Sequence, residues 1–332
     1  MRIAVFAKSK ARTQTTRSIA RALARAGHTL CVIREAKRRQ WVGRRLAQRW
    51  TVASVRRFAP DFALIHAQDV SQPVFAGLAG RIPTVMFTPD CWPSPIATQD
   101  LGLATHVDLL CTVAHGQVAE FERAGVKRAA YLAEAHDPEL YYPVESAAAE
   151  LRSEVAFIGK YGRDSQLHAT RGALIPAVAA RFDLKLYGGG WRELGLVATR
   201  GDVYPEQYRE ICRGAGIVLG CDWRHDIQWY FSNRTWFTLG ARGFLLTNYS
   251  PGLEEIFENH RHLVWYRSVD ECLELIDHYR ARPDERARIA AEGHAFARAH
   301  RSYDDFARDL VDLFEGREPR FPPRIGGLRP SA

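Results

Sequence analysis

Short apolar runs that alternate with longer helix-like segments are the feature that most limits how this chain of 332 residues can fold. A buried strand appears as four to eight apolar residues, whereas a helix buries one stripe of a longer segment. Strands that alternate with helices form parallel sheets through βαβ crossovers. The pattern therefore predicts an α/β protein and disfavours an all-β or an all-α fold.

The expected strands fall into two groups along the chain. The first group covers residues 3–6, 28–33, 62–66, 84–87 and 108–113. The second group covers residues 155–158, 184–187, 217–219, 244–246 and 263–266. Each group is typical of one Rossmann-like domain. We expect the two domains to face a central cleft, with ligands beyond the carboxyl ends of the strands.

A polar segment with two prolines, HDPELYYP followed by ESAAAELRSE, marks the change from one group of strands to the other. We interpret residues 1–143 as the first domain and residues 144–153 as a linker. Residues 154–316 then form the second domain, and residues 317–332 form an irregular tail rich in Pro, Gly and Arg.

The net charge of +8 indicates an anionic partner such as nucleic acid, a membrane surface or a phosphorylated substrate. Six scattered cysteines without a C-x-x-C pair predict neither a zinc site nor a disulfide framework. The sequence has no apolar run of bilayer length, and its first residues lack a secretory h-region. We therefore expect a cytoplasmic protein, with peripheral attachment to the inner membrane face as an alternative.

Two glycine-rich turns follow strands of the second group. In GKYGRDSQ, Gly159 lets backbone N–H groups approach an anion, and Lys160 and Arg163 supply positive charge. In YGGGW, Gly188 and Gly189 likewise permit close approach of the backbone to a ligand. Ordinary βα turns would explain the same glycines, so phosphate binding and a plain turn both remain open from these residues alone.

The stretch FSNRTWFTLGARGFLLTN places Asn233 and Arg234 where a helix over residues 235–241 is expected to begin. An anion at this position would meet unpaired N–H donors, the positive end of the helix dipole and a guanidinium. The simpler alternative is an N-cap residue followed by a solvated arginine.

Carboxylates also follow two strands of the second group. Asp222 comes directly after residues 217–219, so its side chain either projects into a ligand site or belongs to a charged surface loop. Glu254 and Glu255 follow the next strand. They are either ordinary dipole partners in a first helical turn or acceptors of hydrogen bonds from ribose hydroxyls.

The motifs of the second half, taken in order, resemble those of a known family. GKYGR, LYGGGW, GDVYPEQYREICRGAGIVLG, SNRTWFTLGARGFLLTN and ERARIAAEGHAFARAHRSYDDFARDL are similar to the C-terminal half of CgeB-like (spore-maturation) glycosyltransferases. The resemblance covers residues 155–310, and the first half matches only in layout. It implies a GT-B fold, in which residues 1–143 form an acceptor domain and residues 154–316 a donor domain.

The resemblance also implies a chemistry, namely hexosyl or pentosyl transfer from a nucleoside-diphosphate sugar that is a substrate, with no cofactor and no required metal. Arginine, lysine and a helix dipole would neutralise the leaving diphosphate. The resemblance implies that Arg234 contacts the diphosphate and that Glu254 or Glu255 lies near donor hydroxyls.

The chain departs from the family pattern at Phe237, where many relatives carry a glutamate that holds the ribose, and at Arg242, where a glycine is usual. A phenylalanine accepts no hydrogen bond. Another acid, namely Glu254, Glu255 or Asp226, then takes over this role, or the donor is held differently. The alternative function is a non-catalytic nucleotide- or nucleic-acid-binding protein on the same scaffold.

Glycosyl transfer with inversion needs a base beside the acceptor hydroxyl, and two strand ends of the first half offer one. Asp90 is the first candidate, because prolines fix its loop and the neighbouring Trp92 could stack on a sugar. His66, which is followed by Asp69, is the second. A turn residue and a satisfied core histidine are the structural alternatives.

Residues 34–57 contain nine Arg or Lys and a single acid, Glu35. An apolar stripe at helical spacing runs through this segment and consists of Val42, Leu46, Trp50 and Ala53. The simplest interpretation is a Rossmann helix that packs the stripe on the sheet. The alternatives are a membrane-surface helix for a lipid-linked acceptor and a phosphate-backbone contact, as in a DNA-modifying glycosyltransferase. The acceptor itself remains open among glycan, lipid, protein and nucleic acid.

Overall fold

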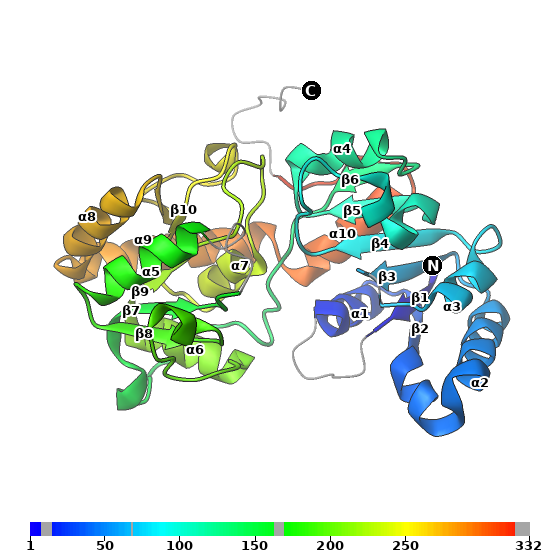
Figure 1. Ribbon diagram of the computed structural model, residues 1–332, viewed down its shortest axis with the longest axis horizontal. Coiled ribbons are helices and arrows are strands. Elements are labelled where there is room, and N and C mark those ends of the chain that lie inside the picture. The colour runs from blue at the N-terminus through cyan, green and yellow to red at the C-terminus, as the bar shows by residue number, and fades with distance from the viewer. Residues whose placement is uncertain (8–14, 68, 163–168, 323–332) are drawn as a thin grey trace. The chain divides into compact units, whose positions relative to one another are not determined.

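The computed structural model describes residues 1–7, 15–67, 69–162 and 169–322, and the chain divides into two compact units. Unit 1 contains Met1–Glu134 and Tyr303–Pro322, and unit 2 contains Ala135–Ser302. Each unit is a parallel sheet with helices on both of its faces, as Figure 1 shows. The prediction of two Rossmann-like units is thus confirmed.

The sheet of unit 1 has six parallel strands in the order β2-β1-β3-β4-β5-β6. Its strands are β1 (Arg2–Phe6), β2 (Thr29–Ile33), β3 (Phe62–His66), β4 (Thr84–Thr88), β5 (Leu109–Thr112) and β6 (Ala129–Tyr131). Its α-helices are α1 (Thr15–Arg25), α2 (Glu35–Phe58), α3 (Gln72–Leu78), α4 (Val118–Arg123) and α10 (Tyr303–Phe314). Because β2 pairs on one side of β1 and β3 on the other, the crevice at the carboxyl edge lies between the loops after β1 and β3.

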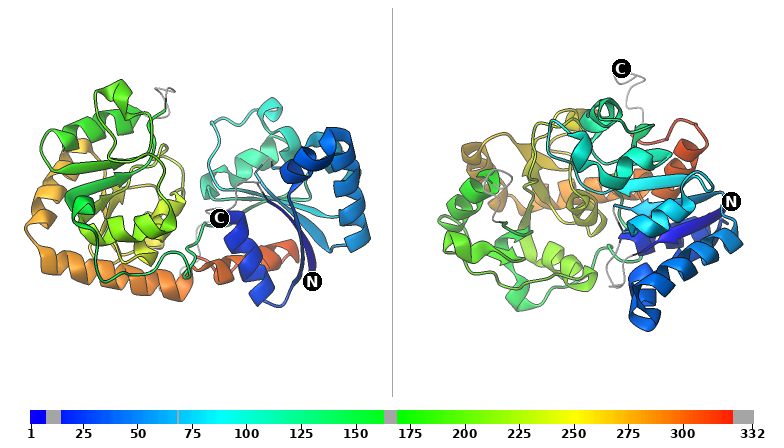
Figure 2. Two further views of the ribbon diagram at one scale, coloured as in Figure 1. Left: turned by 90° about the horizontal axis from the view of Figure 1, so that it is seen from below. Right: turned by 45° about the vertical axis from the view of Figure 1, so that its right-hand side comes forward.

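The core of unit 1 has two layers, because successive strand residues face opposite sides of a sheet. Ala63 and Ile65 of β3 pack with apolar residues of α2, α3 and α4. On the opposite face, Phe62 lies 4.4 Å from Phe314 of α10, measured between ring centroids. Figure 2 shows the sheet between its layers of helices.

Helix α10 belongs to unit 1, whereas the sequence prediction placed it in the second domain, residues 154–316. Its apolar face covers the sheet of unit 1, where the rings of Phe306 and Phe87 are 4.9 Å apart. The Tyr303 hydroxyl donates a hydrogen bond of 2.8 Å to the Glu134 carboxylate. Within the described residues the chain therefore passes between the units twice, after Glu134 and after Ser302, and not once at the predicted linker.

The sheet of unit 2 has five parallel strands in the order β11-β10-β9-β7-β8. Its strands are β7 (Ser153–Ile158), β8 (Leu184–Tyr187), β9 (Ala215–Leu219), β10 (Leu245–Asn248) and β11 (Val264–Tyr266). Its α-helices are α5 (Ala169–Ala179), α6 (Pro205–Gly214), α7 (Asn233–Gly240), α8 (Val269–Arg280) and α9 (Pro283–His300). Helices α5 and α8 pack on one face of the sheet, and α6 and α7 pack on the other.

The strand order of unit 2 fixes the position at which a ligand is expected. Strand β7 pairs with β8 on one side and with β9 on the other, so the order reverses between β7 and β9. In open α/β sheets, ligands bind outside the carboxyl ends of the strands at such a switch point. The loops after β7 and β9 therefore flank the expected site.

Helix α2 buries a different stripe from the one predicted. Its buried residues include Ala47, Thr51 and Val55, which follow each other at intervals of four. The predicted stripe of Val42, Leu46, Trp50 and Ala53 lies in solvent. The prediction was wrong because the helix packs through small side chains, and because its backbone breaks at Gly43 (φ 75°, ψ 170°). No helix in the described parts of the chain is long and apolar enough to cross a membrane.

Candidate functional site

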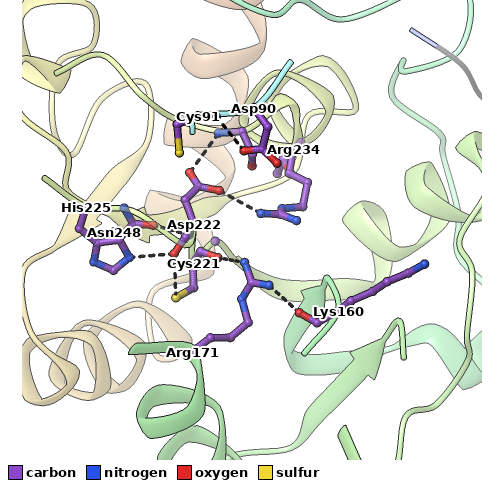
Figure 3. A network of polar contacts seen from close by, with 12 residues as sticks. Asp90, Cys91, Lys160, Arg171, Cys221, Asp222, His225, Arg234 and Asn248 are labelled. Carbon is purple, nitrogen blue, oxygen red and sulfur yellow. Dashed lines mark hydrogen bonds and ion pairs between the residues drawn. The ribbon is translucent and has the colours of Figure 1, made fainter. Parts of the chain in front are cut away.

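A charge pair at the switch point of unit 2 anchors the start of α7 (Figure 3). Asp222 follows β9, is buried, and accepts a hydrogen bond of 2.9 Å from Nη2 of Arg234 through Oδ1. Its Oδ2 accepts a bond of 3.0 Å from the backbone N–H of Ser232, the residue before α7. Its own N–H donates to Oδ1 of Asn248 at 2.7 Å. Both carboxylate oxygens are thus occupied by protein donors, so Asp222 positions Arg234.

Arg234 presents unused donors at this edge of the sheet. Its side chain is 28% exposed, and Asp222 is its hydrogen-bond partner among the residues that the structure describes. Its Nη1 lies 3.5 Å from where a Cβ on Gly159 would be, beside the loop after β7. Burial opposes the charge, but the Asp222 carboxylate outweighs it and raises the pKa of Arg234. The guanidinium therefore stays charged and has Nε and Nη1 available for an anion.

Arg171, in the first turn of α5, ties together the two loops that flank the switch point (Figure 3). Its Nη1 donates to the carbonyl of Lys160 and its Nη2 to the carbonyl of Cys221, each at 2.5 Å. Burial and the positive charge of Arg234 lower its pKa. Two guanidiniums and one carboxylate leave a net positive charge at the site. Sequence reasoning missed Arg171, although a cation in a first helical turn opposes the helix dipole and signals a special partner.

The glycine-rich turns hold the loop after β7 against the loop after β8. Gly188 has φ +116°, and a Cβ there would lie 2.1 Å from the Gly159 carbonyl oxygen. The N–H of Tyr161 donates to the carbonyl of Gly189 at 2.9 Å, while Gly189 itself is exposed. The glycine at 188 is therefore required by close packing between the two loops.

The side chains of Lys160 and Asn233, which were also predicted for the site, are not hydrogen-bonded to the charge pair. Lys160 is exposed, and its Nζ lies 3.5 Å from a carboxylate oxygen of Asp202. Arg163 lies outside the described residues. Asn233, the first residue of α7, is half-buried, and its side chain has no hydrogen-bond partner within the described ranges. The helix begins two residues earlier than predicted and leaves its first N–H groups at the switch point.

Glu254 and Glu255 lie in a short 3-10 turn, η6 (Leu253–Glu255), after β10. Both are exposed. Glu254 accepts a hydrogen bond of 2.9 Å from the Tyr249 hydroxyl. Oε1 of Glu255 lies 3.1 Å from where a Cβ on Gly252 would be. Because β10 pairs with β9, both carboxylates occupy the edge of the sheet that carries Asp222.

Phe237 is part of an aromatic cluster. Its ring stacks on Tyr141 with centroids 3.9 Å apart and an interplanar angle of 5°. It also meets Tyr208 edge-on at 6.0 Å. The stack holds the segment after Ala135, predicted to belong to the first domain, against α6 and α7 of unit 2. The side chain at 237 therefore has a packing role in place of the hydrogen bond that a glutamate would make.

In unit 1, His66 and Asp69 lie at the carboxyl end of β3, beside that unit's switch point. Nδ1 of His66 and Oδ2 of Asp69 are 3.6 Å apart, and their side chains are 13% and 9% exposed. Neither ring nitrogen of His66 has a hydrogen-bond partner among the described residues. The pair is a half-buried imidazole beside a carboxylate, an arrangement that can accept a proton.

Asp90 follows β4, the neighbour of β3, and is exposed. Its Oδ1 accepts a hydrogen bond of 3.0 Å from the N–H of Cys91. Trp92, expected to stack on a sugar, packs edge-on against Phe121 with centroids 5.6 Å apart. Its indole N–H donates to the Thr88 hydroxyl at 3.2 Å, so the ring packs at the edge of the core of unit 1.

Residues 170–312 match a family model described as glycosyl transferase-like. No curated protein sequence matches the chain at a significant level.

The chain is similar in structure to HepE from Anabaena, solved in complex with UDP and glucose, with a TM-score of 0.63 and 12% identity over 95% of this chain and 100% of that one. It is also similar to sucrose-phosphate synthase from Thermosynechococcus elongatus, with a TM-score of 0.66 and 11% identity over 95% and 98% of the chains. A third similar structure is an alpha-glucosyltransferase in complex with UDP and a 13-mer DNA, with a TM-score of 0.63 and 10% identity over 95% and 99%.

The two parallel-sheet units and these structural likenesses establish the GT-B fold for this chain. The family match over residues 170–312, which covers most of unit 2 and reaches into α10, adds the class of protein. The chain is a glycosyltransferase of GT-B architecture.

Proposed function

We propose that the enzyme transfers a sugar from a nucleoside-diphosphate donor whose diphosphate binds at the switch point of unit 2. The observation that carries this proposal is the Arg234 guanidinium, which Asp222 holds at the start of α7 with Nε and Nη1 unused. Nucleoside diphosphates are the donor fragments bound in HepE and the alpha-glucosyltransferase, both in complex with UDP. We therefore take UDP as the first probe.

The diphosphate is the leaving group of the transfer, and its negative charge grows as the glycosidic bond breaks. Arg234 would donate two charge-assisted hydrogen bonds to it, and the first N–H groups of α7 would add further donors. Arg171 lies behind the same loops and contributes positive potential without a direct bond. Donors fixed before the reaction stabilise developing charge without reorganisation. The protein itself thus supplies the electrostatic help that this step requires.

Glu255 is the better candidate for the donor hydroxyls. The carboxylate of Glu254 already accepts the Tyr249 hydroxyl, whereas that of Glu255 is exposed beside Gly252. The ring of Phe237 is taken up by Tyr141, so residue 237 contributes nothing polar to the ribose.

For the acceptor, His66 is the base that we favour over Asp90 in an inverting reaction. Its half-buried neighbour Asp69 would stabilise the imidazolium that forms when the acceptor hydroxyl loses its proton. Asp90, which already accepts the N–H of Cys91, is the second candidate.

Two finer assignments rest on the sequence, the family kind on the resemblance of the motifs and the location on the scattered cysteines without a C-x-x-C pair. We propose that the chain is of the CgeB-like kind and acts in the cytoplasm, where nucleotide sugars are made. The acceptor class stays open among glycan, lipid, protein and nucleic acid.

The function is tested by incubating the protein with UDP-, GDP- and TDP-sugars and measuring the released nucleoside diphosphate by chromatography. We expect slow hydrolysis of at least one donor, with a rate that falls at least about 30-fold in Arg234→Ala because two charge-assisted bonds are lost. Arg192→Ala, at an exposed position of unit 2, is the matched control. If no donor is turned over and the protein binds DNA in a salt-sensitive manner, the proposed enzyme function is wrong and the alternative, a nucleic-acid-binding protein, is supported.

A further inference from the structure

Helix α2 and the adjoining end of β2 carry an exposed patch of apolar and basic side chains that has no role in the proposed donor site. We call it the tryptophan–arginine patch, and it consists of Val32 at the end of β2 and, from α2, the exposed Lys37, Trp41, Leu46 and Trp50 and the half-buried Arg38. Trp41 is 63% exposed, Leu46 is 59% exposed and Trp50 is 42% exposed. Residues 39–46 are exposed without interruption, and Figure 1 shows the first half of α2 projecting away from the sheet of unit 1.

The aromatic residues of the patch are assembled into one surface. The break at Gly43 lets Trp41 and Trp50 approach to 6.4 Å between ring centroids although they are nine positions apart. Lys37 lies over the ring of Trp41 at 5.0 Å, and Arg38 lies over the ring of Trp50 at 4.5 Å. A solvent-exposed apolar cluster of this kind marks an interaction surface.

Positive charge surrounds this cluster. Of the ten charged residues between 34 and 57, the one acid is Glu35, which is buried and accepts the N–H of Ser71 at 2.9 Å. A hollow of about 260 Å³ beside Trp41 is lined by Val32, Arg34, Lys37 and Arg38. Three cations around one hollow suit a phosphate group. The same charge would repel a second copy of this face.

We propose that the tryptophan–arginine patch docks the enzyme on a lipid bilayer with anionic headgroups. Indole rings occupy the membrane interface, aliphatic side chains enter the acyl boundary, and Lys and Arg meet the headgroup phosphates. Leu46 and the exposed Val42 give this face aliphatic side chains, which can enter the apolar part of a bilayer but have no partner on a phosphate backbone. One face of each tryptophan ring is already covered by a cation, which leaves less of it to stack on nucleic-acid bases. This inference does not depend on the donor site, because all its residues lie in unit 1.

The test uses the full chain and flotation with vesicles of pure phosphatidylcholine or with 30% phosphatidylglycerol added. We expect flotation with the anionic vesicles only, reduced about fivefold by Lys37→Gln, since each basic residue near the surface contributes about 1 kcal/mol. Trp41→Ser/Leu46→Ser is expected to reduce binding at least about tenfold. The matched control is Val197→Ser/Tyr204→Ser, which removes an exposed aliphatic and an exposed aromatic residue from unit 2.

Three results would overturn the proposal. They are equal flotation of the patch variant and the control variant, equal binding to neutral and anionic vesicles, and displacement from anionic vesicles by single-stranded DNA at micromolar concentration. Circular dichroism of each variant verifies that the fold is intact, and because the substituted side chains are exposed we expect unchanged spectra.

Discussion

Replacing Phe237 by glutamate restores the residue type that the CgeB-like pattern carries, and the structure predicts that it destabilises the protein. Phe237 makes two aromatic contacts, the stack on Tyr141 at 3.9 Å and the edge-on contact with Tyr208 at 6.0 Å. Each such pair contributes about 1 kcal/mol beyond area burial. Burial of a partly covered phenylalanine adds about 2 kcal/mol. Phe237→Glu is therefore expected to lower the free energy of unfolding by about 4 kcal/mol.

Urea titration followed by circular dichroism measures this change. Phe237→Leu is the matched variant, because it keeps most of the burial and loses both aromatic contacts, so we expect a loss of about 2 kcal/mol. Donor affinity of Phe237→Glu should not exceed that of the wild type, since residue 237 faces Tyr141. A glutamate variant within about 1 kcal/mol of the wild type that also binds donor more tightly would refute the packing role.

Three further predictions concern the sites and the pH range of stability. Asp222→Asn removes the charge that holds Arg234, so we expect the free energies of donor binding and of unfolding each to weaken by about 2 kcal/mol. Asp277→Asn, in an exposed ion pair, is the control for both titrations. Equal effects of the two substitutions would contradict the anchoring role of Asp222. His66→Gln should leave donor affinity unchanged and lower kcat about 100-fold or more, whereas an unchanged kcat would remove His66 as the base. Burial raises the pKa of the Cys111 thiol from its ordinary 9.0 to about 12. As the pH rises, the unfolded chain therefore loses the Cys111 proton before the folded protein does. We expect the contribution of Cys111 to the free energy of unfolding to stay constant below pH 9 and to fall between pH 9 and 12, so that the fall is less steep in Cys111→Ala. Identical pH profiles for the two proteins would contradict this expectation.

The fold was predictable because each sheet is built from apolar runs that are buried on both faces. Strand β3, predicted at residues 62–66, has those bounds in the structure. Strand β6 was missed because Ala129–Tyr131 is short and contains two alanines, which give a weak apolar signal. Helix α10 was assigned to the wrong unit because its apolar face is equally compatible with either sheet. The tertiary contacts of α10 decide between them, among them those of Phe306, Phe314 and Tyr303.

The candidate site was predictable in its location and less so in its roles. The predicted strand before Asp222 and the predicted helix start at Arg234 put both residues at one edge of the sheet, but the sequence does not show that both oxygens of Asp222 are occupied by Arg234 and Ser232. The requirement for Gly188 comes from the carbonyl of Gly159, a contact between loops that lie 29 positions apart. Such partners depend on tertiary packing, which no local pattern encodes.

The prediction that the apolar stripe of α2 packs on the sheet was wrong for a related reason. Helical periodicity identifies an apolar face, yet it does not say whether that face meets the protein or another partner. Here the small residues Ala47 and Thr51 are buried, and Leu46 and Trp50 are exposed.

Isothermal titration of UDP and of uridine into the wild type and Arg234→Ala tests the diphosphate site most directly. The two ligands differ only in the diphosphate, so the comparison isolates its contact with the guanidinium. We expect Arg234→Ala to weaken UDP binding about 30- to 100-fold, which corresponds to about 2–3 kcal/mol, and to leave uridine binding unchanged. An equal loss for both ligands, or no loss for either, would show that the diphosphate does not bind at Arg234.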